Sequence, residues 1–226
     1  MYAGHFAIGV ALSSRFRDVP AWIPLFGVAW LDLVHAVLVA VGVERVTSGL
    51  PANGYLHMKL DFIDWDHSLA MAIVWSMLAG LAIWRGKSIW ALSAVVGTVA
   101  VFSHFLADAL VHDPDLALWP HSPIHVGFGL WSSLPVASWF LEVGFVVALA
   151  WYGARVHPRK WDALQYPLAL MFFLALQLTP WWSLIQLAGS SPLTSSPIVH
   201  GVFLLVGFIL PAGLMSWLLR RPPVIP

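Results

Sequence analysis

The sequence contains no cysteine, so disulfide bonds, thiolate metal ligands and cysteine nucleophiles are excluded. Charged residues are also scarce: they make up 10% of the chain, whereas soluble domains carry roughly 25%. The net charge is zero, so no basic surface is available and we expect no nucleic-acid partner. What remains is a chain that is 60% hydrophobic and contains 10 histidines. Any metal that it binds must therefore be held by His, Asp or Glu side chains.

Apolar segments long enough to cross a bilayer dominate the chain. Six of them lie near 20–43, 67–84, 88–111, 134–154, 162–188 and 197–219. A further apolar run, 1–14, is short for a span and could be a tilted or partly inserted helix. We therefore predict an all-α, polytopic transmembrane helix bundle that forms a single membrane domain, 1–226. It would have six spans plus a short N-terminal helix, which would be a seventh span if it crosses.

The distribution of Lys and Arg predicts the orientation. Nine basic residues lie in loops 15–19, 85–87 and 155–161 and in the tail: Arg15, Arg17, Arg85, Lys87, Arg155, Arg159, Lys160, Arg220 and Arg221. The remaining loops, 44–66, 112–133 and 189–196, hold only Arg45 and Lys59. Because basic loops stay on the cytoplasmic side, we expect a multi-pass protein with a cytoplasmic C-terminus.

The stretch FSHFLADALVHD, 102–113, carries an unusual polar face for so apolar a segment. His104, Asp108 and His112 are spaced by four residues, which places them on one face of a helix. The predicted orientation puts His104 and Asp108 in the outer half of the membrane and His112 at the outer end of the segment. Separate segments send His5, Asp32 and His67 to the same side and a similar depth: His5 begins 1–14, Asp32 lies in 20–43, and His67 opens 67–84.

Three interpretations of this convergence are open. An ionisable group in the hydrocarbon costs about 2.5–3.5 kcal/mol on insertion scales, so several together must pair, hydrate or bind a cation. They could be satisfied polar contacts between helices, part of a proton or ion pathway, or a metal site. Imidazole and carboxylate are the ligand set for Zn, Mn or Fe, and the metal site is our main interpretation. Nearby, we expect Asp66 to cap the helix that starts at His67, and Asp64 to be a secondary candidate.

The order of the motifs resembles a known family. The chain reads GH at 4–5, then Asp32, WDHSL at 65–69, SHFLAD at 103–108 and WP at 119–120. This order resembles the bacterial inner-membrane YdjM-like family of putative metal-dependent hydrolases and, more distantly, the zinc-dependent phospholipase C and P1-type nuclease group. The resemblance covers roughly 1–125, whereas 126–226 offers only additional transmembrane helices.

The resemblance implies a location and a ligand set. The location would be the bacterial inner (cytoplasmic) membrane. The zinc ligands would be His5, Asp32, His67, His104 and Asp108, with His112 or His121 as a further ligand. The soluble enzymes have a second His-x-x-x-Asp/Glu pair that this chain lacks, so we expect one or two ions.

Together these features predict a metal-dependent hydrolase. Asp64 or Asp32 would orient or deprotonate a water molecule, and the substrate would be a phosphoester or ester of a lipid-like molecule reached from the outer side. Membrane lipids are the expected surroundings. One alternative is a non-catalytic scaffold or accessory subunit with partner membrane subunits and a structural or vestigial metal site. The other is a small transporter or proton conductor, in which Asp32, Asp108 and Glu142 would line a path.

Overall fold

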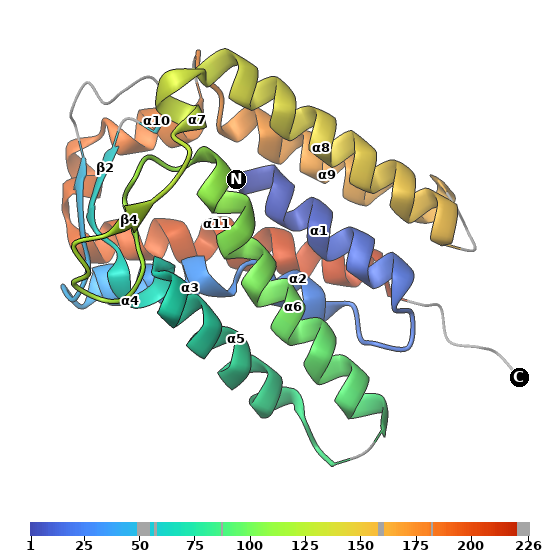
Figure 1. Ribbon diagram of the computed structural model, residues 1–226. Coiled ribbons are helices and arrows are strands. Elements are labelled where there is room, and N and C mark those ends of the chain that lie inside the picture. The colour runs from blue at the N-terminus through green and yellow to red at the C-terminus, as the bar shows by residue number, and fades with distance from the viewer. Residues whose placement is uncertain (49–54, 57, 87, 158–160, 182, 221–226) are drawn as a thin grey trace, which may run out of the picture.

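The computed structural model describes residues 1–48, 55–56, 58–86, 88–157, 161–181 and 183–220. Within these ranges the chain forms eleven α-helices, one short 3-10 helix and two two-stranded antiparallel sheets (Figure 1). The prediction of a helical fold is confirmed, and the two small sheets are additions to it. Four basic residues used above for the orientation lie outside the described ranges: Lys87, Arg159, Lys160 and Arg221.

Three helices of the described chain are long and apolar enough to cross a membrane. They are α6 (Ser88–Val111), α8 (Pro135–Val156) and α11 (Pro197–Leu218). The other expected spans are shorter, so the prediction of six spans is not confirmed. The shorter helices are α2 (Trp22–Gly27), α3 (Trp30–Ala40), α5 (Leu69–Ile83), α9 (Trp161–Gln177) and α10 (Leu184–Gly189).

Apolar side chains cover the outside of the bundle as well as its core. Leu81 on α5, Phe140 on α8 and Leu210 on α11 are all well exposed. A soluble monomer rarely exposes such extensive apolar surface, because water solvates it poorly. The three long apolar helices and this outer surface indicate a membrane protein.

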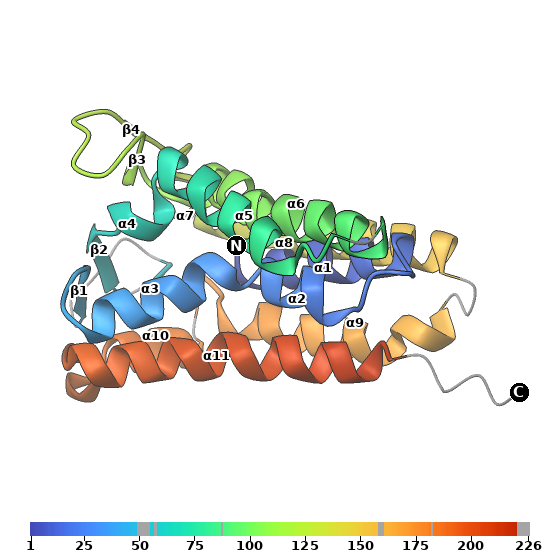
Figure 2. The same cartoon turned by 90° about the horizontal axis from the view of Figure 1, so that it is seen from below.

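Helix α1 (Tyr2–Arg15) lies in the middle of the bundle, not at its edge. It packs against α2, α6, α8, α9 and α11, and Figure 2 shows it between the α5–α6 layer and the α9–α11 layer. Its buried positions are mainly small residues, among them Ala3, Gly4 and Ala7, which let neighbouring helices approach closely. The short apolar run at 1–14 is therefore a core helix that carries His5 into the interior.

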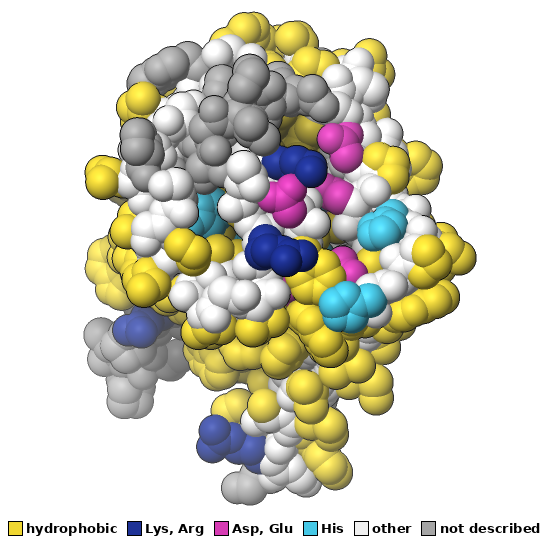
Figure 3. Space-filling view, turned by 90° about the vertical axis from the view of Figure 1, so that its left-hand side faces the viewer, with side chains coloured by type: hydrophobic (Ala, Val, Ile, Leu, Met, Phe, Trp, Pro, Cys, Tyr) yellow, Lys and Arg dark blue, Asp and Glu magenta, His cyan; other side chains and the backbone are white. Residues whose placement is uncertain are grey.

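The connections between helices gather at two opposite ends. The turns after α1, α5 and α8, together with the end of α11, lie at one end (Figure 1). The other end holds α4 (Asp64–His67), the sheet of β1 (Arg45–Ser48) and β2 (Met58–Phe62), and the sheet of β3 (Leu116–Ala117) and β4 (His125–Val126). Facing this second end, Figure 3 shows charged and histidine side chains near the centre, surrounded by hydrophobic ones. Two short helical turns, α7 (Leu130–Ser133) and the 3-10 helix Pro192–Ser195, complete the connections.

The segment expected as a span over 20–43 is interrupted at Val28 and Ala29, both fully buried. The break is held against α6 by Gly27: a Cβ there would lie only 2.7 Å from the Cβ of Ala100. Irregular backbone at membrane depth is tolerated where protein surrounds it and its polar groups find partners. The Val28 carbonyl finds such a partner in His104 Nδ1, at 2.6 Å. The break thus lets α2 pack against α6 while α3 continues along α11 and brings its first turn to His104.

Candidate metal centre

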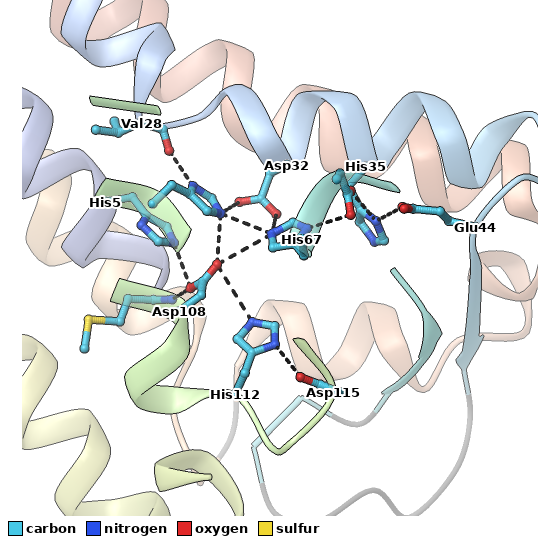
Figure 4. Close-up of polar contacts among 12 residues, drawn as sticks. His5, Val28, Asp32, His35, Glu44, His67, Asp108, His112 and Asp115 are labelled. Carbon is cyan, nitrogen blue, oxygen red and sulfur yellow. Dashed lines mark hydrogen bonds and ion pairs between the residues drawn. The ribbon is translucent and has the colours of Figure 1, made fainter. Parts of the chain in front are cut away.

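Asp108 on α6 is the centre of a buried polar cluster (Figure 4). Its Oδ2 lies 2.9 Å from His104 Nε2, 3.6 Å from His67 Nε2 and 3.9 Å from His112 Nε2. Its Oδ1 lies 3.0 Å from His5 Nε2 and also contacts the amine of Met1. The spacing of four residues in α6 therefore does what the sequence predicted: it turns His104, Asp108 and His112 toward one point.

Asp32 supplies a second carboxylate to the cluster from the first turn of α3. It lies 3.4 Å from His104 Nε2 and 3.9 Å from His67 Nε2, and these two nitrogens are 3.3 Å apart. Ligands at zinc distances of about 2.0–2.1 Å in a tetrahedron are separated by about 3.3 Å. The donor atoms of Asp32, His67 and His104 are therefore close enough to act as ligands of one small cation.

The opposite ring nitrogen of each of three cluster histidines is held by an oxygen. His104 Nδ1 donates to the Val28 carbonyl at 2.6 Å, and His112 Nδ1 donates to Asp115 Oδ1 at 3.2 Å. His67 Nδ1 lies 2.8 Å from Asp66 Oδ1. An acceptor at Nδ1 keeps the proton there and leaves the Nε2 lone pair free, as in most histidines that bind metals. The hydrogen bonds of His104 and His112 thus leave their Nε2 atoms free to accept a cation, whereas at His67 the contact with Asp66 is an ion pair without hydrogen-bond geometry.

His5 reaches the cluster from α1 on the other side of His104. Its ring stacks on that of His104, with centroids 3.8 Å apart and planes 7° apart. Its Nδ1 is buried and has no hydrogen-bond partner among the described residues. Three overlapping sets of donors are close enough to hold an ion: His5, His104 and Asp108; Asp32, His67 and His104; and His35, Asp66 and His67.

A second line of buried polar groups runs from the cluster toward the end of the molecule. Asp66 Oδ2 lies 2.9 Å from His35 Nδ1, which lies 2.7 Å from Glu44 Oε2. Glu44 Oε1 in turn accepts a hydrogen bond from the Trp65 backbone N–H at 3.0 Å. This line connects α3, α4 and the start of β1 behind His67.

The pKa values in this line respond to burial and to the neighbouring imidazoles. Burial raises the pKa of Glu44 to about 7, although its hydrogen bond with His35 opposes the change. Burial alone would also raise the pKa of Asp66, but His67 and His35 together hold it well below its ordinary value. Asp66 is therefore a buried anion that faces two imidazoles.

The sequence assigned Asp66 to a helix cap, and this was wrong. The chain makes a separate short helix, α4, and Ser68 caps α5 by accepting a hydrogen bond from the Met71 N–H at 3.3 Å. Asp66 instead faces His67 and His35. Its adjacency to His67 was the one signal for this role. No signal in the sequence predicted that Glu44, a loop residue, would contact His35.

Asp64 and His121 contact each other away from the cluster. Asp64 Oδ2 accepts a hydrogen bond from the His121 backbone N–H at 2.7 Å, and the His121 ring stacks on Phe62 with centroids 4.9 Å apart. Of the two further ligands that the resemblance implied, the structure brings His112 to the cluster and places His121 in this loop. The catalytic role of Asp64 stays a prediction, since its visible contact anchors the loop.

A cavity of about 140 Å³ adjoins the cluster. One side of it is polar and includes His5, Asp32, His67, Asp108 and His112. The rest of the lining is largely apolar, and much of it comes from α11 and β2, with Phe203, Phe208 and Leu60 among its residues. Five of the six candidate ligands therefore border a space that a second molecule can enter, and His104 lies behind them, fully buried.

Comparisons with protein-family models, with curated protein sequences and with solved structures gave no match. The class of protein thus rests on the fold and the site. This is a mainly helical protein with three helices suited to cross a membrane, and its buried His and Asp groups could hold a metal ion.

Proposed function

We propose that the protein is a membrane-embedded, metal-dependent hydrolase that cleaves a phosphoester or ester of a lipid-like substrate. The observation that carries this proposal is the cavity with two unlike walls, one of His and Asp donors and one of apolar side chains. An amphiphilic molecule could place its ester beside the donors and its hydrocarbon against the apolar wall. We keep Zn as the expected metal, with Mn or Fe as alternatives and one or two ions.

The residues of the cluster have distinct tasks in this proposal. A divalent ion would activate water near neutral pH and stabilise charge on the ester oxygens. His67, His104 and Asp108 would hold the ion, since their donor atoms lie closest together. Asp32 is less deeply buried than Asp108 and lines the cavity, so its carboxylate can orient or deprotonate a water there.

The membrane setting also belongs to the proposal. The cluster lies toward the end of the bundle that carries α4 and the small sheets, opposite the end where Arg15 and Arg85 lie. By the positive-inside rule the basic end is cytoplasmic, and the cluster then faces the outer side of a bacterial inner membrane. The YdjM-like resemblance of 1–125 points to the same location.

The two other functions predict different behaviour. A proton or ion path would need Glu142, but Glu142 Oε1 accepts a hydrogen bond from the Gly4 N–H at 2.9 Å and so caps the start of α1. This contact accounts for a buried carboxylate without a path. A scaffold or accessory subunit would retain the metal and copurify with a partner membrane protein, and it would hydrolyse no ester.

The test is metal analysis of the purified chain together with its His104→Ala/Asp108→Ala double variant. We expect close to one or two zinc or manganese ions per chain in the wild type and loss of the metal in the double variant. A His125→Ala variant is the control, because His125 is exposed on β4 and outside the cluster. Folded wild-type protein without metal would refute the proposal. Metal without hydrolysis of phospholipid or acyl ester substrates would favour the scaffold.

A further inference from the structure

His200 is a buried histidine that the cluster does not use. It lies in the first turns of α11, is only 3% exposed, and its Nε2 has no hydrogen-bond partner among the described residues. It lines the same cavity as Asp32 and Asp108. Leaving a buried polar atom unpaired is unfavourable, and a ligand that bonds to it would remove that cost.

The same helix supplies much of the apolar wall. Phe203, Leu204, Gly207 and Phe208 follow His200 at helical spacing and line the cavity with it. Among the described residues, a Cβ added at Gly207 would have just the Tyr2 hydroxyl, at 3.6 Å, as a near neighbour. Glycine at this position therefore leaves room between α11 and α1 that a larger side chain would fill.

The apolar wall continues onto the outside of the protein. Phe203 lines the cavity and is also 38% exposed. Its neighbours on α11, Val199, Val202 and Val206, are exposed apolar residues. A hydrocarbon chain that lies against α11 can therefore extend from the cavity toward the surrounding lipid without crossing a polar surface.

We propose that His200 and α11 form the substrate-binding subsite for an amphiphile with an alkyl chain. The His200 Nε2 hydrogen-bonds an oxygen of the ester or phosphoester group inside the cavity that it shares with the His and Asp donors, and the chain lies along Phe203, Gly207 and Phe208. Among the described residues that line the cavity there is no Lys or Arg, so the anionic charge of a phosphoester is balanced by the metal and by hydrogen bonds. This subsite rests on the proposed function for the identity of the polar group.

The test uses dodecyl phosphate as the probe and full-length, metal-loaded protein in phosphatidylcholine nanodiscs. His200→Phe removes the ring nitrogens but keeps an aromatic ring, and we expect it to weaken probe binding about tenfold, as the loss of one good hydrogen bond does. Its metal content should equal that of the wild type. His125→Phe is the matched control, since His125 is an exposed histidine on β4, and it should bind the probe normally.

A second variant tests the chain-binding wall independently of His200. Gly207→Leu fills the space beside Tyr2, so it should abolish photo-crosslinking of a dodecyl phosphate with a terminal diazirine to α11 while leaving the metal in place. Equal probe affinity in His200→Phe and wild type, or wild-type crosslinks that avoid α11, would overturn the subsite. Loss of metal from His200→Phe would also overturn it, because His200 would then support the metal centre. Absence of metal from the wild type would instead refute the hydrolase itself.

Discussion

The first 125 residues and the last hundred use buried ionisable groups in different ways. In the first part such groups contact one another: His5, His35, Glu44, Asp66, His67, His104, Asp108 and His112 form one connected set of imidazoles and carboxylates. In the last part, Glu142 and His200 are separate, one capping a helix and the other facing the cavity. The groups that could hold an ion therefore lie in the first part, whereas the last part supports the core and, in our proposal, offers a wall for the ligand.

The largest expected effect is a loss of metal affinity when the contact between Asp66 and the proposed ligand His67 is changed. Asp66→Asn keeps the shape of the side chain but removes the anion that holds His67 Nδ1. We expect metal affinity to fall about 10- to 100-fold, which is typical for partners that orient a metal-bound histidine. Competition with a chelator measures this change. Asp61→Asn is the control, since Asp61 is an acidic residue on the nearby strand β2 and contacts Thr47 and Lys59. An unchanged metal affinity in Asp66→Asn would show that Asp66 does not support the metal site.

A smaller effect is expected where the two parts of the chain meet. α11 approaches α3 closely at Gly201, where a Cβ would lie 2.4 Å from the Ala36 carbonyl oxygen. Gly201→Ala must push these helices apart, and overpacking of this kind costs about 1–3 kcal/mol. Unfolding in mixed micelles would measure this loss. Gly213→Ala on the same helix has open space around it and should be neutral or stabilising. Equal stability of the two variants would contradict the close packing of α11 on α3.

The smallest expected effect tests whether Glu142, a buried polar residue of the last part, has a structural role. Glu142→Ala removes the acceptor for the Gly4 N–H, and loss of a helix cap costs typically about 1 kcal/mol. Metal content should stay unchanged, because Glu142 belongs to none of the candidate ligand sets. Leu141→Ala, at an exposed neighbouring position, is the control for truncation in α8. A variant that folds normally but loses its metal would contradict the division between the two parts.

Much of the cluster could be predicted, because residue spacing within one helix and the predicted orientation of the helices in the membrane are both read from the sequence. The spacing of four residues places His104, Asp108 and His112 on one helical face, whatever that helix packs against. The asymmetry of Lys and Arg then sends His5, Asp32 and His67 to the same end. The structure brings these six residues together, and their role as ligands remains the prediction that metal analysis will test.

The features that escaped prediction depend on contacts between distant segments. Hydropathy suggested a continuous span over 20–43, but the interruption at Val28 depends on His104, which lies 76 residues away and binds the freed carbonyl. The local sequence around Asp66 fits a helix cap. In the fold, however, His35 approaches from α3, and the Asp66 carboxylate contacts its ring instead. The run 1–14 is short for a span, and its length left its place in the bundle open. The structure shows that five other helices pack against it, which the length of the run does not reveal.

The sequence by itself determined that this chain is helical, apolar and rich in His and Asp on particular helix faces. Composition and periodicity act within a segment, so they can be read without knowing the partners of that segment. Only the tertiary structure decided which ring nitrogens of His104 and His112 are free, which carboxylates lie beside His67 and His35, and that His200 lines the same cavity as the cluster. These depend on distances of a few ångströms between residues far apart in the chain, and packing alone sets such distances.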